Sequence, residues 1–190
     1  MAKIVLASGS PRRQELLQRI GIADFTIRVP QVEEWYPDDL SPADIVSYIS
    51  REKSQAVPSD DDEIVITADT MVFLDDKRLG KPTDTADALR MLTALSGRRH
   101  TVCTGVTVRQ GARMLTRSAS TDVYFRSAAE AELRSYIAGG EPMDKAGAYG
   151  VQGQGALLVE RIDGDFFNVM GLPVLLLSQM LREFGVTLLS

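Results

Sequence analysis

One acidic side chain, Asp69, interrupts an apolar run at residues 64–74 that is typical of a central strand. An unpaired carboxylate buried in a strand is costly, so we expect Asp69 to have a cationic partner, a metal ion or a solvent-filled cleft beside it. A carboxylate placed in this way can take a proton from water or help to hold a divalent cation. The alternative is a structural aspartate held in a salt bridge.

Two neighbouring arginines form the second chemical feature. Ser10 is predicted to be the N-cap of a helix and Pro11 its first residue, which places Arg12 and Arg13 in the first turn. The positive end of a helix dipole disfavours cations. Two guanidinium groups beside free backbone N–H groups would, however, form a strong site for a phosphate. The alternative is a solvated pair on the surface.

Two lysines extend this set of cations. Ile45, Ile49 and Lys53 follow one another at helical spacing, so Lys53 continues an apolar stripe. Its amine either reaches the surface or points into a cleft. Lys81 lies in a predicted tight turn, Gly80-Lys81-Pro82. Together with the arginines, these lysines could neutralise the roughly four negative charges of a nucleoside triphosphate.

Both helices and strands are predicted to position these residues. Helices are predicted at residues 11–20, 42–56 and 83–95. A fourth helix is predicted to start with a capping box of Ser127 and Glu130 and to end at about residue 138, and a last one follows Pro173. Strands are predicted at residues 25–29, 64–74, 101–108 and 156–162, and a further strand follows Gly111 and reaches about residue 125. Gln110-Gly111 is typical of a hairpin turn. The fold class is therefore α/β with a mixed sheet.

Composition narrows the possible functions. The 190 residues carry a net charge of −5, which argues against a duplex nucleic-acid binder. Cys103 is the one cysteine, so disulfides and cysteine zinc sites are excluded, and both His100 and Cys103 are expected to be structural. No apolar run is long enough to span a bilayer, and no secretory pattern follows Met1. We therefore expect no membrane partner and a cytoplasmic location.

The order of these motifs resembles the Maf family of nucleoside triphosphate pyrophosphatases. The matching segments begin at residues 6–13 and 51–53, continue at 68–70 and 80–82, and end at 144–153 and 168–173. The resemblance implies one domain over residues 1–190, with a curved mixed sheet and flanking helices forming two lobes around a central cleft, as in inosine triphosphatase-like folds. It also implies hydrolysis of a nucleotide at the α–β phosphoanhydride, which gives a monophosphate and pyrophosphate.

The resemblance also implies roles for individual residues. The matching aspartate of the family is taken as the proton acceptor, which here is Asp69. Glu33, together with Asp69, is expected to hold Mg²⁺ or Mn²⁺, because hard cations prefer oxygen ligands. The expected substrate-binding residues are Ser8, Ser10, Arg12, Arg13, Lys53, Thr70, Lys81 and Gln152. The expected partner is a small-molecule nucleoside triphosphate, and a homodimer is possible.

The nucleobase is a separate question, because one branch of the family acts on dTTP and UTP and another on 7-methyl-GTP. This chain resembles the pyrimidine branch at Arg12, Thr70 and Gln152. The glutamine amide can donate to one atom and accept from the next, which suits O4 and N3–H of thymine or uracil. Two alternatives stay open: a 7-methyl-GTP pyrophosphatase, and a non-enzymatic nucleotide-binding regulator of cell division.

Overall fold

The computed structural model describes residues 3–189, and these residues fall into two compact units. The first unit contains residues 3–70, 104–119 and 171–189, and the second contains residues 71–103 and 120–170. Asp69 and Thr70 therefore belong to the first unit, whereas Lys81 and Gln152 belong to the second. Among the described residues, no helix has the length and apolar composition needed to cross a bilayer.

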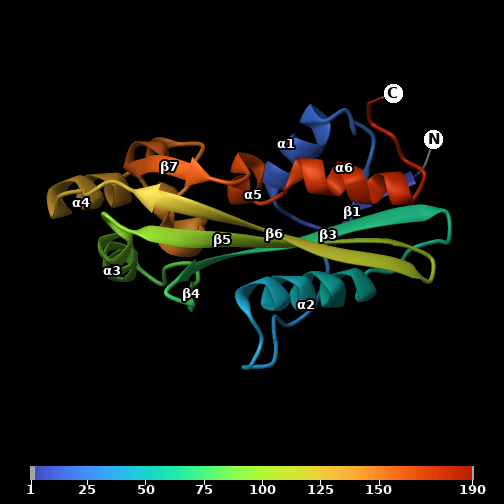
Figure 1. Cartoon of the computed structure of the whole chain (residues 1–190), viewed down its shortest axis with the longest axis horizontal. Helices are drawn as coiled ribbons and strands as arrows, with labels where there is room; N and C mark the ends of the chain where they lie inside the picture. Colours follow the sequence, from blue (N-terminus) through green and yellow to red (C-terminus); the bar gives the residue numbers. More distant parts are fainter. Residues whose placement is uncertain (1–2, 190) are drawn as a thin grey trace. The chain divides into compact units, whose positions relative to one another are not determined.

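Helices and strands alternate through most of the chain, as Figure 1 shows. The first half contains β1 (Lys3–Leu6), α1 (Pro11–Arg19), β2 (Thr26–Ile27), α2 (Pro42–Gln55), β3 (Glu63–Leu74), β4 (Lys77–Leu79) and α3 (Thr85–Leu95). The second half contains β5 (Arg99–Gln110), β6 (Arg113–Phe125), α4 (Glu130–Ala138), β7 (Val159–Asp163), α5 (Phe166–Met170) and α6 (Val174–Glu183). Three short 3₁₀ helices, η1 (Glu141–Asp144), η2 (Ala146–Ala148) and η3 (Gln154–Leu158), lie between α4 and β7.

The sheet is mixed, as expected. Over the described residues it has seven strands in the order β2-β1-β3-β5-β6-β7, with β4 paired to β3. β1 runs parallel to β2 and β3, whereas β4 is antiparallel to β3 and β7 is antiparallel to β6. β3 is buried along nearly its whole length, which explains its almost continuous apolar sequence.

Helices cover both faces of the sheet in the first unit. Figure 1 shows α2 on one face and α1 and α6 on the other. α2 is fixed by polar contacts as well as by its buried Ile45 and Ile49: the Ser50 hydroxyl lies 2.8 Å from that of Thr107, and Thr67 donates to the Ser50 carbonyl. These bonds set the position of α2 against the strands, and so fix where Lys53 points.

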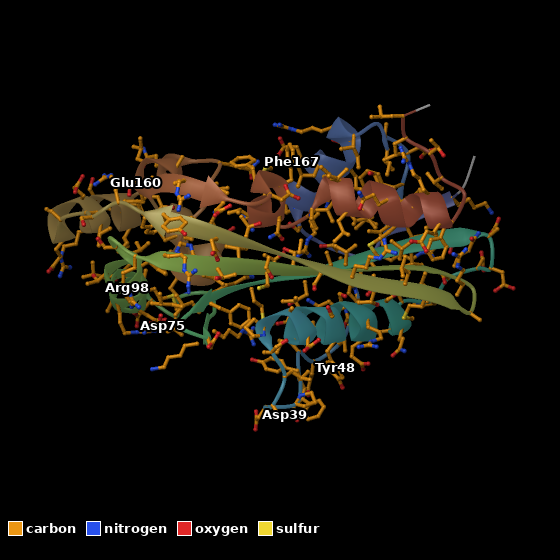
Figure 2. The ribbon with its side chains drawn as sticks, viewed as in Figure 1. Asp39, Tyr48, Asp75, Arg98, Glu160 and Phe167 are labelled. Carbon is orange, nitrogen blue, oxygen red and sulfur yellow. The ribbon has the colours of Figure 1, made fainter. Side chains whose placement is uncertain are left out.

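The second unit has its own hydrophobic core, built from α3, α4 and the strands beside them. Leu92, Leu95, Val123 and Leu133 are fully buried there. The turn between β3 and β4 is held by an ion pair between Asp75 and Arg98, both labelled in Figure 2. Such an exposed pair contributes little to stability, so the apolar core dominates.

Several sequence predictions need correction at the level of boundaries. The predicted capping box of Ser127 and Glu130 is wrong: α4 begins at Glu130, and the carboxylate that reaches back to the chain is that of Glu132, which accepts from the N–H of Ala129. The strand predicted at 156–162 begins only at Val159, because a 3₁₀ helix precedes it. α5 was not predicted, since five residues are too few to show a helical period.

Candidate active site

Asp69 and Lys53 form the centre of the candidate site in the first unit. Asp69 lies on β3 and is only 5% exposed. The Nζ atom of Lys53, from α2, donates to its Oδ1 at 2.7 Å. Lys53 therefore does not carry its amine to the surface: its side chain is 15% exposed and points at Asp69. Of the three environments expected for this carboxylate, the structure contains the cationic partner.

The second carboxylate oxygen of Asp69 differs from the first in its hydrogen bonding. Oδ2 is buried, and among the described residues it has no hydrogen-bond partner. A buried carboxylate oxygen without a donor is costly unless a ligand, a water or a cation completes it. One oxygen of Asp69 thus holds the residue in place through Lys53, while the other is available for chemistry.

A second carboxylate reaches the same ammonium group. Glu34, in the segment before α2, accepts from Lys53 Nζ at 2.8 Å. The sequence prediction chose its neighbour Glu33, whose side chain is exposed and makes none of the ion pairs found in the described part of the chain. The Glu34 side chain is itself 42% exposed, and nothing in the spacing of the two glutamates tells which one contacts Lys53.

The donor set can be tested for a metal ion. The described residues contain no group of three histidine, cysteine, aspartate or glutamate side chains arranged to hold one. Mg²⁺ in nucleotide-processing sites is often held by only one or two carboxylates together with substrate phosphates. The convergence of Asp69 and Glu34 on one ammonium nitrogen shows that two carboxylates reach a single cation here, so the set fits such an ion.

Arg13 makes its hydrogen bonds to other groups of the first unit. Its guanidinium donates to the Ser8 hydroxyl at 3.1 Å, to the Thr70 hydroxyl at 3.1 Å and to the Gly171 carbonyl at 2.9 Å. Burial among these groups lowers the pKa of Arg13, although an arginine stays charged at neutral pH. Arg13 therefore joins α1, the strand that carries Asp69 and the turn before α6.

Ser8, Ser10 and Arg12 complete this end of the first unit. The Ser8 hydroxyl is buried and also accepts from the N–H of Ser10, at 3.2 Å. Ser10 has the extended backbone of an N-cap, but its side chain makes no capping hydrogen bond. Arg12 lies in the same helical turn and forms none of the ion pairs or hydrogen bonds found among residues 3–189. The sequence treated the two arginines alike, whereas the structure engages Arg13 and leaves the charge of Arg12 available.

Lys81 and Gln152 lie in the second unit, on segments that contact each other. Lys81 is exposed and follows β4, and Gln152 is exposed within the glycine-rich segment 144–155. The N–H of Gly147 donates to the Gly80 carbonyl at 3.1 Å, which ties that segment to the Gly80-Lys81-Pro82 turn. The residues predicted for phosphate and for base are thus carried by neighbouring backbone.

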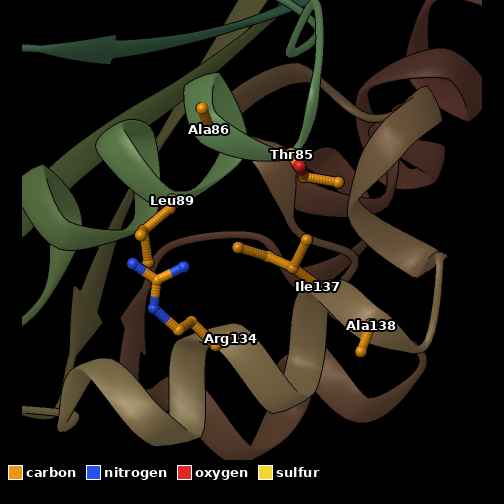
Figure 3. A pocket seen from close by; sticks show the side chains of 6 residues that line it. All are labelled: Thr85, Ala86, Leu89, Arg134, Ile137 and Ala138. Carbon is orange, nitrogen blue, oxygen red and sulfur yellow. The ribbon is translucent and has the colours of Figure 1, made fainter.

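A separate pocket of the second unit contains none of the predicted site residues. It has a volume of about 380 Å³ and is lined by Thr85, Ala86, Leu89, Arg134, Ile137 and Ala138. Figure 3 shows it between α3 and α4, with Arg134 reaching across from α4 toward Leu89. The charge of Arg134 is matched by Glu130, one turn earlier on the same helix. The lining offers neither a base nor an uncompensated cation for a phosphate.

Comparison with known proteins identifies the family of this chain. Residues 3–184 match the family described as Maf-like protein. The chain belongs to the Maf-like family. This match includes both units, the Lys53–Asp69 pair, and the segments that carry Lys81 and Gln152.

Relatives of this Maf-like chain extend over nearly its full length. It is 48% identical over 189 residues to a dTTP/UTP pyrophosphatase of Moorella thermoacetica, covering 98% of this chain and 97% of that protein. It is 48% identical over 183 residues to a dTTP/UTP pyrophosphatase of Exiguobacterium sibiricum, covering 96% and 93%. A dTTP/UTP pyrophosphatase of Bacillus cereus is 44% identical over 187 residues, covering 98% and 97%.

Solved structures support the fold of the Maf-like chain. A HAM1 protein from Coxiella burnetii superimposes with a TM-score of 0.52 at 14% identity, covering 96% of this chain and all of that one. At this identity the likeness concerns the fold alone. The α/β class with a mixed sheet is thereby confirmed.

Proposed function

We propose that this protein hydrolyses dTTP and UTP to the nucleoside monophosphate and pyrophosphate. The observation that carries the proposal is the state of Asp69, whose Oδ1 is held by Lys53 while its buried Oδ2 is without a partner among the described residues. Relatives with this activity at 44–48% identity over nearly the whole chain support the same substrate class.

Asp69 acts as the base in this proposal. Its Oδ2 takes a proton from a water molecule as that water attacks the α-phosphorus, and the bond from this phosphorus to the bridging oxygen of the β-phosphate breaks. Pyrophosphate leaves, and the water oxygen stays on the monophosphate. Lys53 orients Asp69, because its ammonium donates to the other oxygen of the same carboxylate.

The cations of the site neutralise the phosphates. Arg12 supplies charge at the N-terminus of α1, where backbone N–H groups also point outward. The Ser8 hydroxyl accepts from Ser10 and Arg13, so both of its lone pairs are used and its own proton is directed to an acceptor such as a phosphate oxygen. Lys53 and Lys81 are further phosphate ligands, as the family resemblance implies.

A divalent cation, Mg²⁺ or Mn²⁺, is part of the proposal. Asp69 would hold it together with a glutamate of the segment before α2, and it would neutralise charge on the phosphates. The sequence favours Glu33 for this glutamate. The contact between Glu34 and Lys53 favours Glu34, because it places that carboxylate at the same cation as Asp69.

The base is recognised by Gln152 in this proposal. Its amide can pair with O4 and N3–H, an edge that thymine and uracil share and cytosine reverses. The alternative substrate, 7-methyl-GTP, presents a larger purine with a different pattern. Arg12 and Thr70 are the other two positions that the resemblance links to substrate preference.

A substrate panel tests the function directly. Pyrophosphate release is measured for dTTP, UTP, CTP and 7-methyl-GTP in the presence of Mg²⁺ or Mn²⁺. The proposal expects the highest kcat/KM for dTTP and UTP. A preference for 7-methyl-GTP would assign the chain to the 7-methyl-GTP branch of the family. Binding of nucleotide without release of pyrophosphate would favour a non-enzymatic nucleotide-binding regulator.

A further inference from the structure

The segment that carries Gln152 is folded around one acidic side chain of the second unit, Glu141. This residue begins η1, a few residues after the end of α4. Its Oε2 accepts from the backbone N–H of Gln154 at 2.9 Å. Its Oε1 accepts from the N–H of Gly155 at 3.1 Å and from the hydroxyl of Tyr136 at 2.8 Å. The carboxylate thus binds the chain directly after Gln152.

Tyr136 extends the same contact to the other side of Gln152. It lies near the end of α4, and its ring is buried. Its hydroxyl donates to Glu141 and accepts from the N–H of Gly150 at 3.1 Å. Three backbone amides, two residues before Gln152 and two and three residues after it, are therefore held by the Tyr136–Glu141 pair. Gln152 itself is exposed between these fixed points.

The glycines of this segment are needed for the contact with Glu141. A Cβ atom on Gly153 would lie 2.3 Å from Glu141 Oε2. One on Gly155 would lie 2.4 Å from the Gly150 carbonyl oxygen and 2.6 Å from the Tyr136 hydroxyl oxygen. Because these distances are below van der Waals contact, a side chain at Gly153 would separate the backbone from the carboxylate, and one at Gly155 would separate it from Gly150 and the Tyr136 hydroxyl. The glycine-rich sequence thus allows the chain to close around an internal anion.

The charge of Glu141 is stabilised by the same groups. Burial alone would raise its pKa, but the hydrogen bonds from Tyr136, Gly155 and Gln154 outweigh burial and lower it. The carboxylate is therefore ionised at neutral pH, and each of its three bonds has a charged acceptor. Such bonds are stronger than those between neutral groups.

From these contacts we propose that Glu141 is a positioning residue for base recognition, which holds the Gln152 backbone in one conformation through Tyr136, Gln154 and Gly155. The proposal rests on the proposed function, because it concerns selection of thymine and uracil. A glutamine amide discriminates between hydrogen-bond patterns only if its backbone is fixed, since a mobile amide can turn to satisfy either pattern. Glu141 does not touch the base in this proposal, and acts through the loop.

Two variants and a matched control test the proposal. Glu141→Gln keeps the shape but replaces one accepting oxygen by an NH₂ group, which meets a donor of the loop. Tyr136→Phe removes only the bonds to Glu141 and Gly150, and serves if the first variant does not fold. Glu132→Gln is the control: Glu132 lies on α4 of the same unit and also accepts from a backbone N–H, that of Ala129, and from Arg126.

Two quantities are measured on each protein. The first is the ratio of kcat/KM for dTTP and UTP to that for CTP, and the second is hydrogen exchange at the amides of Gly150, Gln154 and Gly155. We expect Glu141→Gln to narrow the ratio by about fivefold or more and to speed exchange at these amides. Glu132→Gln should lower the thermal midpoint without changing either quantity.

The outcomes separate this proposal from the proposed function. A wild-type protein that releases no pyrophosphate from dTTP or UTP contradicts the function before any variant is made. A selective wild type whose ratio is unchanged in folded Glu141→Gln and Tyr136→Phe overturns the role of Glu141 and leaves the function standing. Slow exchange that persists in both variants overturns the positioning whatever the activity.

Discussion

Lys53 Nζ and Asp69 Oδ1 lie 2.7 Å apart, although the two residues come from a helix and a strand and are 16 positions apart in the chain. The pair is almost closed to solvent, so its charges are weakly screened. Because the ammonium occupies one oxygen of the carboxylate, we expect the proton transfer and the metal binding proposed for Asp69 to use the other. The first two predictions rest on this difference between the two carboxylate oxygens of Asp69.

Asp69→Asn is expected to abolish hydrolysis and leave the fold intact. The change removes the negative charge and the proton acceptor but little volume, and Lys53 keeps Glu34 as its partner. We expect kcat to fall by at least about a hundredfold. The measurement is pyrophosphate release from dTTP, with circular dichroism and the thermal midpoint to establish folding.

A control for this variant is Asp122→Asn. Asp122 is a strand aspartate of the second unit that accepts from Thr101 and Arg99. Its replacement should reduce stability somewhat and leave kcat within a few-fold of wild type. Near wild-type turnover in well-folded Asp69→Asn would remove Asp69 from the mechanism.

Glu34→Gln and Glu33→Gln distinguish the two candidates for the second metal ligand. We expect Glu34→Gln to raise the Mg²⁺ or Mn²⁺ concentration needed for half-maximal activity by about tenfold or more, because a ligand carboxylate is lost. Glu33→Gln is the matched control and should leave that concentration nearly unchanged. The measurement is a metal titration of dTTP hydrolysis at fixed substrate. A shift confined to Glu33→Gln would contradict Glu34 as the metal ligand and support Glu33, the residue predicted from the sequence.

The contrast between Glu33 and Glu34 illustrates what a sequence can and cannot predict here. The α/β class, α2 and the central strand follow from apolar periodicity and capping residues, which are local signals. The bond from Arg13 to the Gly171 carbonyl joins positions 158 residues apart, and no spacing in the chain encodes it. Likewise, Glu63 at the start of β3 is buried and accepts hydrogen bonds from both terminal nitrogens of Arg28, which lies 35 positions earlier, and no local pattern encodes this contact.

Other parts of the site stay predictions. The roles of Lys81 and Gln152 rest on the family resemblance and on their place in neighbouring segments of the second unit. The Mg²⁺ or Mn²⁺ ion, the homodimer and the cytoplasmic location also stay predictions. The sequence names the chemical groups of the candidate site, but not which of two neighbouring glutamates contacts Lys53.

His100 is expected to make stability depend on pH. It is the one histidine of the chain, it is buried, and its Nε2 lies 2.7 Å from the Tyr149 hydroxyl. Burial lowers its pKa from 6.5 to about 4. The unfolded chain therefore takes up a proton near pH 6.5, whereas the folded protein does so only near pH 4. The contribution of the neutral His100 to the free energy of unfolding is therefore fully present above pH 6.5 and is lost as the pH falls toward 4.

The measurement for this prediction is urea unfolding of wild type and His100→Gln between pH 7.5 and 4. We expect the wild type to lose roughly 3 kcal/mol more unfolding free energy over this interval than the variant, which has no group to titrate at that position. Carboxylates contribute equally to both proteins, so the difference isolates His100. Parallel pH profiles would show that the imidazole titrates alike in the folded and unfolded chain.

Gln152→Ala tests the assignment of the base. If the amide pairs with O4 and N3–H, then dTTP and UTP are both good substrates of the wild type, because the 5-methyl group and the 2′-hydroxyl lie off that edge. CTP carries an amino group at position 4 and lacks N3–H, so it reverses the pattern and leaves polar groups unpaired, a mismatch that a fixed site rejects strongly. Loss of the amide should lower kcat/KM for dTTP and UTP and narrow their lead over CTP.

The control for Gln152→Ala lies in the same segment. Gln154 is also an exposed glutamine, and it contributes its backbone N–H to Glu141, which alanine retains. Gln154→Ala should therefore leave the ranking of dTTP, UTP and CTP unchanged. The measurement is kcat/KM for these nucleotides and 7-methyl-GTP with wild type and both variants. Because the two changes are identical in chemistry and two positions apart, a ranking that moves only in Gln152→Ala assigns the base contact to that side chain, and a ranking that moves in neither contradicts it.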